Sequence, residues 1–177
     1  MLTDIVGSTA LLSRIGDAAY LEVIEHHDQI MLAALRRHGG EVVRNMGDGM
    51  LVAFSQPATA LSWIDEVHRS VLEQLGLGIR VGAHFGPAYV RLADYVGISI
   101  HVVARLGAMA GQGELLASIR FIERVGRHLD GELLHLALRG VDELTAVLSI
   151  RLGSDSTYTR PGGDLGHRRV AAKSAAG

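Results

Sequence analysis

The stretch EVVRNMGDGMLVAF, residues 41–54, holds two runs of strand-forming residues on either side of the turn Gly47-Asp48-Gly49. A glycine-rich turn between two such runs predicts a β-hairpin that carries Asp48 at its tip. A second aspartate, Asp4, has a similar setting, because a short apolar segment precedes it and Gly7 follows it closely. Each carboxylate stands where a strand gives way to a glycine turn, so both can be directed at one point.

Two carboxylates directed at one point predict a cation site. Hard cations such as Mg²⁺ take oxygen ligands and are usually held by one or two carboxylates, with substrate phosphates completing the shell. The segment Gly7-Ser8-Thr9 after Asp4 is expected to open a helix, whose free N–H groups can receive those phosphates. The pattern therefore predicts a site for a metal ion and a polyphosphate.

The bulk composition narrows the function classes. The chain has 177 residues, is 48% hydrophobic and has a formal charge of −2, which fits one globular domain and gives no basic field for nucleic acid. No apolar run approaches the roughly 20 residues that cross a bilayer, so no membrane partner is expected. Cysteine is absent, which excludes disulfides and thiolate metal sites and suits a reducing cytoplasm. With no visible signal peptide, we expect a cytoplasmic protein.

Periodicity and turn residues predict an α+β fold with a mostly antiparallel sheet. Ser8 or Thr9 is expected to cap a short helix, and Asp17 to cap a longer amphipathic one that ends at Gly39-Gly40. Further helices are expected at 58–75, 98–110 and 121–128, and strands at 42–43, 50–54, 114–117, 133–138 and 146–152. Residues 78–90 predict a bent strand or a second hairpin, followed by a loop that carries Asp94. From 153 to 177 the composition predicts a disordered tail after a domain at 1–152.

Five motifs occur in one order along the chain: TDIVGST (3–9), VVRNMGDGMLVAF (42–54), RVGAHFG (80–86), DYVGISIHVVARL (94–106) and LRGVDE (138–143). In this order they resemble the catalytic domain of class III nucleotidyl cyclases, as found in many actinobacterial proteins. Any one motif alone would be weak. The resemblance runs from about residue 2 to residue 152.

The resemblance implies a fold, an assembly and a reaction. The fold is a ferredoxin-like βαββαβ core, and the assembly is a head-to-tail homodimer with active sites at the interface. The reaction is in-line attack of the ribose 3′ oxygen on the α-phosphorus of a nucleoside triphosphate, with release of pyrophosphate. Two Mg²⁺ or Mn²⁺ ions per site would lower the pKa of the 3′-hydroxyl and neutralise the leaving group.

The resemblance also implies residue roles. In one chain, Asp4, Asp48 and the Ile5 carbonyl would bind the metals, while the amides of Gly7, Ser8 and Thr9 would hold the phosphates. The partner chain would supply Arg44 and Asp94 to read the base, Arg105 to stabilise the transition state, His101 to orient the ribose and Arg139 to meet the terminal phosphates. His101 and Arg105 are four residues apart and would share one helix face.

Three positions depart from the family pattern. Arg44 replaces a lysine, yet as a donor it suits adenine N1 while Asp94 as an acceptor suits the adenine amino group, so the pair favours ATP over GTP. His101 replaces an asparagine, and a misplaced donor typically costs about 10² to 10³ in rate, so low activity is expected. Only three residues precede Asp4. Either the first strand is stunted or the natural chain begins upstream.

Two functions are therefore open. The first is an adenylate cyclase that forms cyclic AMP from ATP. The alternative is a degenerate cyclase domain that binds nucleotide, or merely dimerises, and regulates a partner. The intact Asp4, Asp48 and Arg105 favour the enzyme, whereas Arg44, His101 and the short start favour the alternative. A diguanylate cyclase is excluded, because Glu41-Val42 follows Gly39-Gly40 where that family has an acidic signature loop.

Overall fold

A computed structural model describes residues 1–92, 94–141 and 144–153. The elements follow in the order β1 (Leu2–Ile5), α1 (Ser8–Ile15), α2 (Asp17–His38), β2 (Glu41–Asn45), β3 (Met50–Ala53), α3 (Pro57–Leu75), β4 (Ile79–Ala83), β5 (Tyr89–Arg91), β6 (Asp94–Val96), α4 (Ile98–Met109), β7 (Glu114–Ser118), α5 (Ile119–Val125), β8 (Glu132–Leu136) and β9 (Thr145–Arg151). Among these described helices, none combines the length and apolar content that a membrane span requires.

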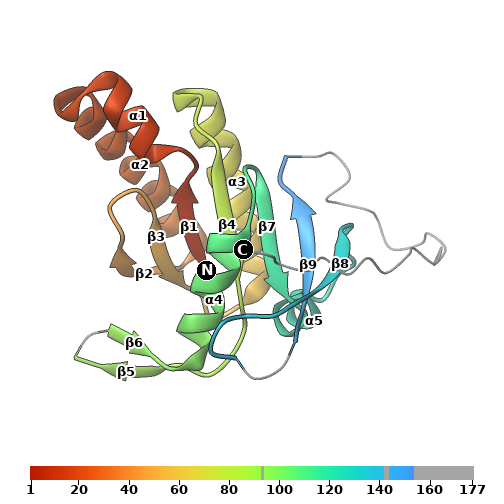
Figure 1. Ribbon diagram of the computed structural model, residues 1–177. Coiled ribbons are helices and arrows are strands. Elements are labelled where there is room, and N and C mark those ends of the chain that lie inside the picture. The colour runs from red at the N-terminus through yellow and green to blue at the C-terminus, as the bar shows by residue number, and fades with distance from the viewer. Residues whose placement is uncertain (93, 142–143, 154–177) are drawn as a thin grey trace.

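Seven strands form one sheet in the order β2-β3-β1-β4-β7-β9-β8, and β5 and β6 form a separate small hairpin (Figure 1). The neighbours β4 and β7 are parallel, whereas the other neighbouring pairs are antiparallel. The segments β1, α2, β2, β3, α3 and β4 make a βαββαβ unit with sheet order β2-β3-β1-β4. The predicted α+β class, the mostly antiparallel sheet and the ferredoxin-like core are confirmed.

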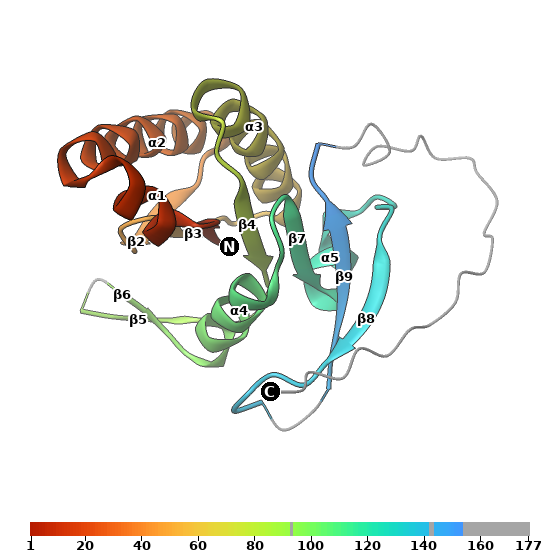
Figure 2. The same cartoon turned by 45° about the horizontal axis from the view of Figure 1, so that its top comes forward.

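Both faces of the sheet are covered. Helices α2 and α3 lie on one face and α4 lies on the other (Figure 2). Successive side chains of a strand point to opposite faces, and β7 shows the result. Leu115 packs in the larger core cluster with α2 and α3, whereas Leu116 packs with Val102 and Leu106 of α4. The sheet therefore carries two apolar cores, and α4 belongs to the smaller one.

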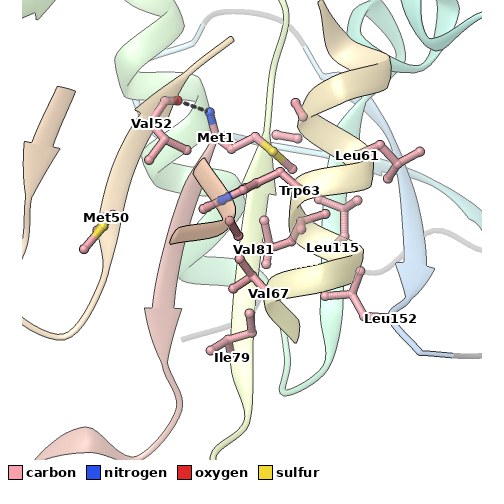
Figure 3. Close-up of a cluster of buried hydrophobic side chains, with 14 of the residues drawn as sticks. Met1, Met50, Val52, Leu61, Trp63, Val67, Ile79, Val81, Leu115 and Leu152 are labelled. Atoms are coloured by element: carbon pink, nitrogen blue, oxygen red, sulfur yellow. Dashed lines mark hydrogen bonds between the residues drawn. The ribbon is translucent and has the colours of Figure 1, made fainter. Parts of the chain in front are cut away.

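Trp63 of α3 lies at the centre of the larger core, near Val67, Val81 and Leu115 (Figure 3). The indole is fully buried, and its Nε1–H donates a hydrogen bond of 3.4 Å to the Met31 carbonyl of α2. A buried Trp N–H needs such a partner, because an unpaired polar group in an apolar core is costly. This one side chain therefore links both helices to the sheet.

Strand β1 has four residues, yet it occupies the middle of the βαββαβ sheet. All four pair with β4, from Leu2 opposite Gly82 to Ile5 opposite Ile79. On its other side the ladder with β3 is brief, and the terminal amino group of Met1 extends it with a hydrogen bond of 2.8 Å to the Val52 carbonyl (Figure 3). The strand is short, and hydrogen bonds on both sides hold it.

Helix α4 approaches β4 unusually closely at Gly82. A Cβ added to Gly82 would lie 2.4 Å from the Gly107 nitrogen and 2.5 Å from the Val103 carbonyl oxygen. Both are backbone atoms of α4 that cannot swing away. The glycine is therefore required for this packing, which fixes the position of the helix that carries His101 and Arg105.

The predicted helix caps were wrong. Gly7 is the N-cap of α1 and Gly16 is the N-cap of α2, and neither helix has a side-chain cap hydrogen bond. Ser8 is the first residue of α1, and its hydroxyl donates instead to the Asp48 carboxylate of the β2–β3 turn. The Ser8 side chain, which local preference predicts as a helix cap, thus binds Asp48, a residue distant in the sequence.

The segment between β4 and α4 was also predicted incompletely. The second hairpin lies at β5 and β6, later than expected, and Asp94 is the first residue of β6 rather than part of a loop. Strands of three residues are too short to give a readable alternation. The helix expected at 121–128 runs from Ile119 to Val125, with the Ser118 hydroxyl as its cap. Apart from Gly153, the expected tail lies outside the described residues.

His84 follows β4 and is held inside the fold. Its Nδ1 lies 2.8 Å from the Ser118 hydroxyl at the end of β7. Burial, together with the smaller effects of the positive charges of Arg120 and the N-terminus, lowers the pKa of His84 from its ordinary 6.5 to about 4. The folded protein therefore keeps this imidazole neutral at pH values where the unfolded chain binds a proton.

We predict that this difference makes the fold less stable in mild acid. Between about pH 6.5 and pH 4 the unfolded state binds a proton that the native state refuses, so the free energy of unfolding falls as pH falls. Above that window His84 contributes no pH dependence. His84→Gln should reduce the loss, measured by urea unfolding at pH 7.5 and pH 5. The exposed His135 of β8 provides the control, and an equal reduction in His135→Gln would contradict the assignment.

Candidate active site

The structure brings the two predicted metal-binding aspartates together. Asp4 lies on β1, and Asp48 lies in the turn that joins β2 to β3. The Ile5 N–H donates a hydrogen bond of 3.0 Å to the Asp48 carbonyl. A Cβ added to Gly49 would lie 2.0 Å from the Thr3 carbonyl oxygen and 3.0 Å from the Asp4 Cα, so only glycine allows this contact. The turn and the strand therefore meet backbone to backbone.

Each carboxylate has one partnered oxygen. Asp48 Oδ2 accepts from the Ser8 hydroxyl, and Asp4 Oδ2 accepts from Arg80 Nε at 2.6 Å. For the part of the chain that the structure describes, Oδ1 of each has no hydrogen-bond or ion-pair partner. Both side chains are partly exposed. Oxygen atoms thus remain for a cation on both aspartates.

Arg80 is a residue of this site that the sequence reasoning missed. It lies on β4 directly opposite Asp4 in the antiparallel ladder. Besides its ion pair with Asp4, its guanidinium donates to the Ala108 carbonyl of α4 at 3.2 Å. The motif RVGAHFG contains Arg80, but its role depends on strand register, which no local pattern reveals.

The first turn of α1 lies beside the carboxylates. Gly7 caps the helix, and the N–H groups of the first turn have no intrahelical partner, as at any helix N-terminus. Tyr20 of α2 is a second neighbour that sequence reasoning did not assign to the site. Burial raises the pKa of its phenol, and the Asp48 carboxylate raises it further, while a hydrogen bond with Ser8 opposes this. Tyr20 therefore remains a neutral phenol next to the acidic pair.

The structure also brings together the two predicted base-reading residues. Arg44 of β2 forms an ion pair with Asp94 of β6, so the hairpin β5–β6 folds back onto β2. The other Asp94 oxygen accepts from the Tyr95 N–H at 2.8 Å, and the Tyr95 hydroxyl donates to the Glu41 carboxylate. Arg44 and Asp94 therefore present a donor and an acceptor side by side on one chain.

His101 and Arg105 share the exposed face of α4, as predicted, while Val102, Val103 and Leu106 are buried on the other face. In the described structure neither exposed side chain makes a hydrogen bond or ion pair with Asp4 or Asp48. Arg139 is exposed in the segment that connects β8 to β9. The remainder of its motif includes residues 142 and 143, which lie outside the described residues. Within one chain, the described contacts therefore do not connect His101, Arg105 or Arg139 to the carboxylates of Asp4 and Asp48.

The chemistry of the donor set suits a hard cation bound together with phosphate. Within the described ranges, no three His, Cys, Asp or Glu side chains group closely enough to form a metal cage. Two neighbouring aspartates with open oxygens, next to a helix N-terminus, instead match sites in which substrate phosphates complete the shell.

A separate open cavity of about 710 Å³ is lined by β2, β3, Tyr95 and the start of α4, and neither aspartate lines it.

Comparisons with known proteins agree with this geometry. The adenylate cyclase of Neurospora crassa is 30% identical over an alignment of 160 residues, with 73% of this chain and 7% of that protein covered. The adenylyl cyclase CyaB of P. aeruginosa has a TM-score of 0.75 at 18% identity, over 88% of this chain and 93% of that one. The guanylyl cyclase Cya2 has a TM-score of 0.71 at 20% identity, over 87% and 91%. No protein-family model matches the chain.

The fold, the motif order and the relatives together define the class of protein. This chain carries a class III nucleotidyl cyclase domain, so the predicted resemblance is confirmed. It spans less than a tenth of the length of its Neurospora relative. Adenylyl and guanylyl cyclases share the fold, so the fold alone does not choose the nucleotide.

Proposed function

We propose that the chain is an adenylate cyclase that converts ATP to 3′,5′-cyclic AMP and pyrophosphate as a head-to-tail homodimer. One observation carries the proposal. The end of β1 and the β2–β3 turn place Asp4 and Asp48 together beside the first turn of α1. This is the arrangement expected for metal-assisted chemistry on a polyphosphate.

Asp4, Asp48 and the Ile5 carbonyl would hold two Mg²⁺ or Mn²⁺ ions. The open Oδ1 atoms support this assignment, and both partnered oxygens lie at partly exposed contacts that can rearrange. When bound, the ions would lower the pKa of the ribose 3′-hydroxyl and neutralise charge on the pyrophosphate. The amides of Gly7, Ser8 and Thr9 would receive phosphate oxygens.

The remaining groups would come from the second copy of the chain. His101 would orient the ribose, and Arg105 would stabilise negative charge as the 3′ oxygen attacks the α-phosphorus and the bond to the β-phosphate breaks. Arg139 would bind the terminal phosphates. Their exposure supports this division, because a guanidinium or imidazole that serves a partner must face outward.

Arg44 and Asp94 support ATP as the substrate. The guanidinium offers only donors, which suit adenine N1, and the carboxylate accepts from the adenine amino group. Guanine in the same pose would set its O6 against the carboxylate and its N1–H against the guanidinium. The ion pair between the two residues keeps them adjacent, so one base can contact both.

A nucleotide-binding or dimerising regulatory module is the second candidate. Arg44 in place of the lysine of the family pattern favours it, because a planar guanidinium is not equivalent to an ammonium at a tight site. His101 in place of asparagine favours it as well. A regulatory module would bind nucleotide without forming a product, and this difference separates the two candidates.

We first predict that the purified chain with ATP and Mn²⁺ forms cyclic AMP, and that Asp4→Ala or Asp48→Ala reduces the rate to background. The physical reason is loss of a carboxylate that holds the cations against the triphosphate. Product formation is measured by chromatography, and Mn²⁺-dependent binding of a non-hydrolysable ATP analogue is measured in parallel. Unchanged analogue binding in both folded variants would contradict the metal assignment. Binding without product in the wild type would favour the regulatory module.

Complementation tests the shared site. Asp48→Ala and Arg105→Ala homodimers should each be inactive, yet a heterodimer of the two rebuilds one intact site. When equal amounts of the two variants exchange subunits freely, about half of the dimers are mixed, and each mixed dimer has one intact site of two. About a quarter of the wild-type activity should therefore return. Subunit exchange is followed with differently tagged chains. If mixed dimers form and stay inactive, both residues act within one chain.

His101 offers a test of the ribose contact. An asparagine amide is compact, whereas imidazole is wider and places its N–H differently. We predict that His101→Asn raises kcat by up to about 10²-fold with little change in nucleotide affinity. Single-turnover cyclisation of ATP from pH 6 to pH 9 provides the measurement. A clear fall in rate would show that His101 is itself required, and no change would favour a site that has decayed at several points.

A further inference from the structure

A chain of hydrogen bonds joins helix α2 to the turn that carries Asp48. His27 Nδ1 lies 3.1 Å from Asp28 Oδ1. The other Asp28 oxygen, Oδ2, accepts from Asn45 Nδ2 at 3.0 Å. Asn45 Oδ1 in turn accepts from the Gly47 N–H at 2.8 Å. Gly47 directly precedes Asp48, so these contacts lead from the helix to the metal-binding residue.

The chemistry of these groups gives each bond one direction. The Gly47 N–H can only donate, so the Asn45 oxygen faces it and the Asn45 NH₂ faces Asp28. Asp28 is a carboxylate and can accept from both neighbours. Burial lowers the pKa of His27, which is therefore neutral and donates from Nδ1. Its buried Nε2 has no hydrogen-bond partner and so carries the lone pair rather than a proton.

The Asp48–Gly49 side of the turn is held by its backbone contact with β1, but little apolar packing holds the side formed by residues 45–47, which therefore needs a separate anchor. Asn45, Met46 and Gly47 are exposed, with 51% of Met46 accessible. At the other end of the chain of bonds, His27 is fully buried within α2, so it offers a rigid attachment. Asn45 also adjoins Arg44, the proposed base contact. A shift of this turn would therefore displace Asp48 and Arg44 together.

We propose that Asp28 and Asn45 are positioning residues that clamp the β2–β3 turn, so that Asp48 is held ready for the metal ions. The inference rests on the proposed cyclase function. Removal of groups that orient metal ligands typically costs about 10- to 100-fold in metal affinity. The clamp acts through Asp48 and touches neither nucleotide nor metal itself.

An exchange of the two side chains tests the clamp. In Asp28→Asn the single amide oxygen cannot accept from both His27 and Asn45, so either two NH₂ groups face each other or the new NH₂ group faces the His27 N–H. In Asn45→Asp two carboxylates face each other, so each single variant loses a bond of the chain. In the double variant Asp28→Asn/Asn45→Asp, the new amide accepts from His27 and donates to the new carboxylate, which still accepts from Gly47 N–H. All three bonds are restored, and only the central bond has its donor and acceptor exchanged. Glu25→Gln, on an exposed residue of α2, is the control for loss of one negative charge.

Two measurements on the full chain read out these variants. One is the exchange rate of the Gly47 amide proton without ligand, and the other is the Mn²⁺ concentration that half-saturates binding in the presence of a non-hydrolysable ATP analogue. Each single variant should exchange faster and need about 10- to 100-fold more Mn²⁺. The double variant should recover to within about threefold on both measurements, and Glu25→Gln should match the wild type. Thermal unfolding shows whether each variant is folded.

The two proposals fail differently. Unchanged Gly47 exchange in both folded single variants, or a folded double variant that is no better than either single variant, would overturn the clamp. A wild type that neither binds Mn²⁺ with the analogue nor forms cyclic AMP would overturn the cyclase proposal. The Gly47 exchange rates would still decide whether the clamp holds the turn.

Discussion

The backbone contact between the β2–β3 turn and β1 is the constraint on which the site depends. Gly49 lets the turn approach Thr3 and Asp4 more closely than any side chain would allow, and the Ile5 N–H bonds the Asp48 carbonyl across the gap. The two carboxylates consequently belong to one unit, although 44 positions separate them in the chain. Helix α1 begins directly after β1, so its N-terminus has a defined place beside the pair.

The helices on the two faces of the sheet support different parts of the site. On one face α2 and α3 bury the larger core, and α2 supports the turn from outside through Asp28. On the other face α4 packs against β4 at Gly82 and keeps His101 and Arg105 exposed. A chain built in this way presents the proposed metal ligands at one place and the proposed transition-state groups at another. The proposed site shared between two copies is consistent with that separation.

Two ion pairs within the chain join charged residues of the site. Arg80 neutralises Asp4 and Arg44 neutralises Asp94, and all four side chains are partly exposed. Exposed ion pairs contribute only about 0 to 1 kcal/mol, so a nucleotide and its cations can replace these partners at low cost. The pairs hold the side chains in place beforehand, which reduces the entropy that binding must remove.

The sequence alone determined the elements whose signal is local. Residues spaced three or four positions apart encode a buried helical face, because one helical turn takes 3.6 residues. Examples are Ile24, His27, Met31 and Leu35 in α2, and Leu61, Ile64, Val67 and Val71 in α3. The Gly-Asp-Gly turn encoded the hairpin, and the motif order encoded the fold class. Only the tertiary structure decided which residues meet across the sheet. Three contacts show this: Arg80 lies opposite Asp4, Ser8 binds Asp48 rather than its own helix, and Asn45 binds Asp28. These contacts depend on strand register and helix placement. Register and placement arise from packing between segments far apart in the chain, so they leave no periodic pattern in the sequence.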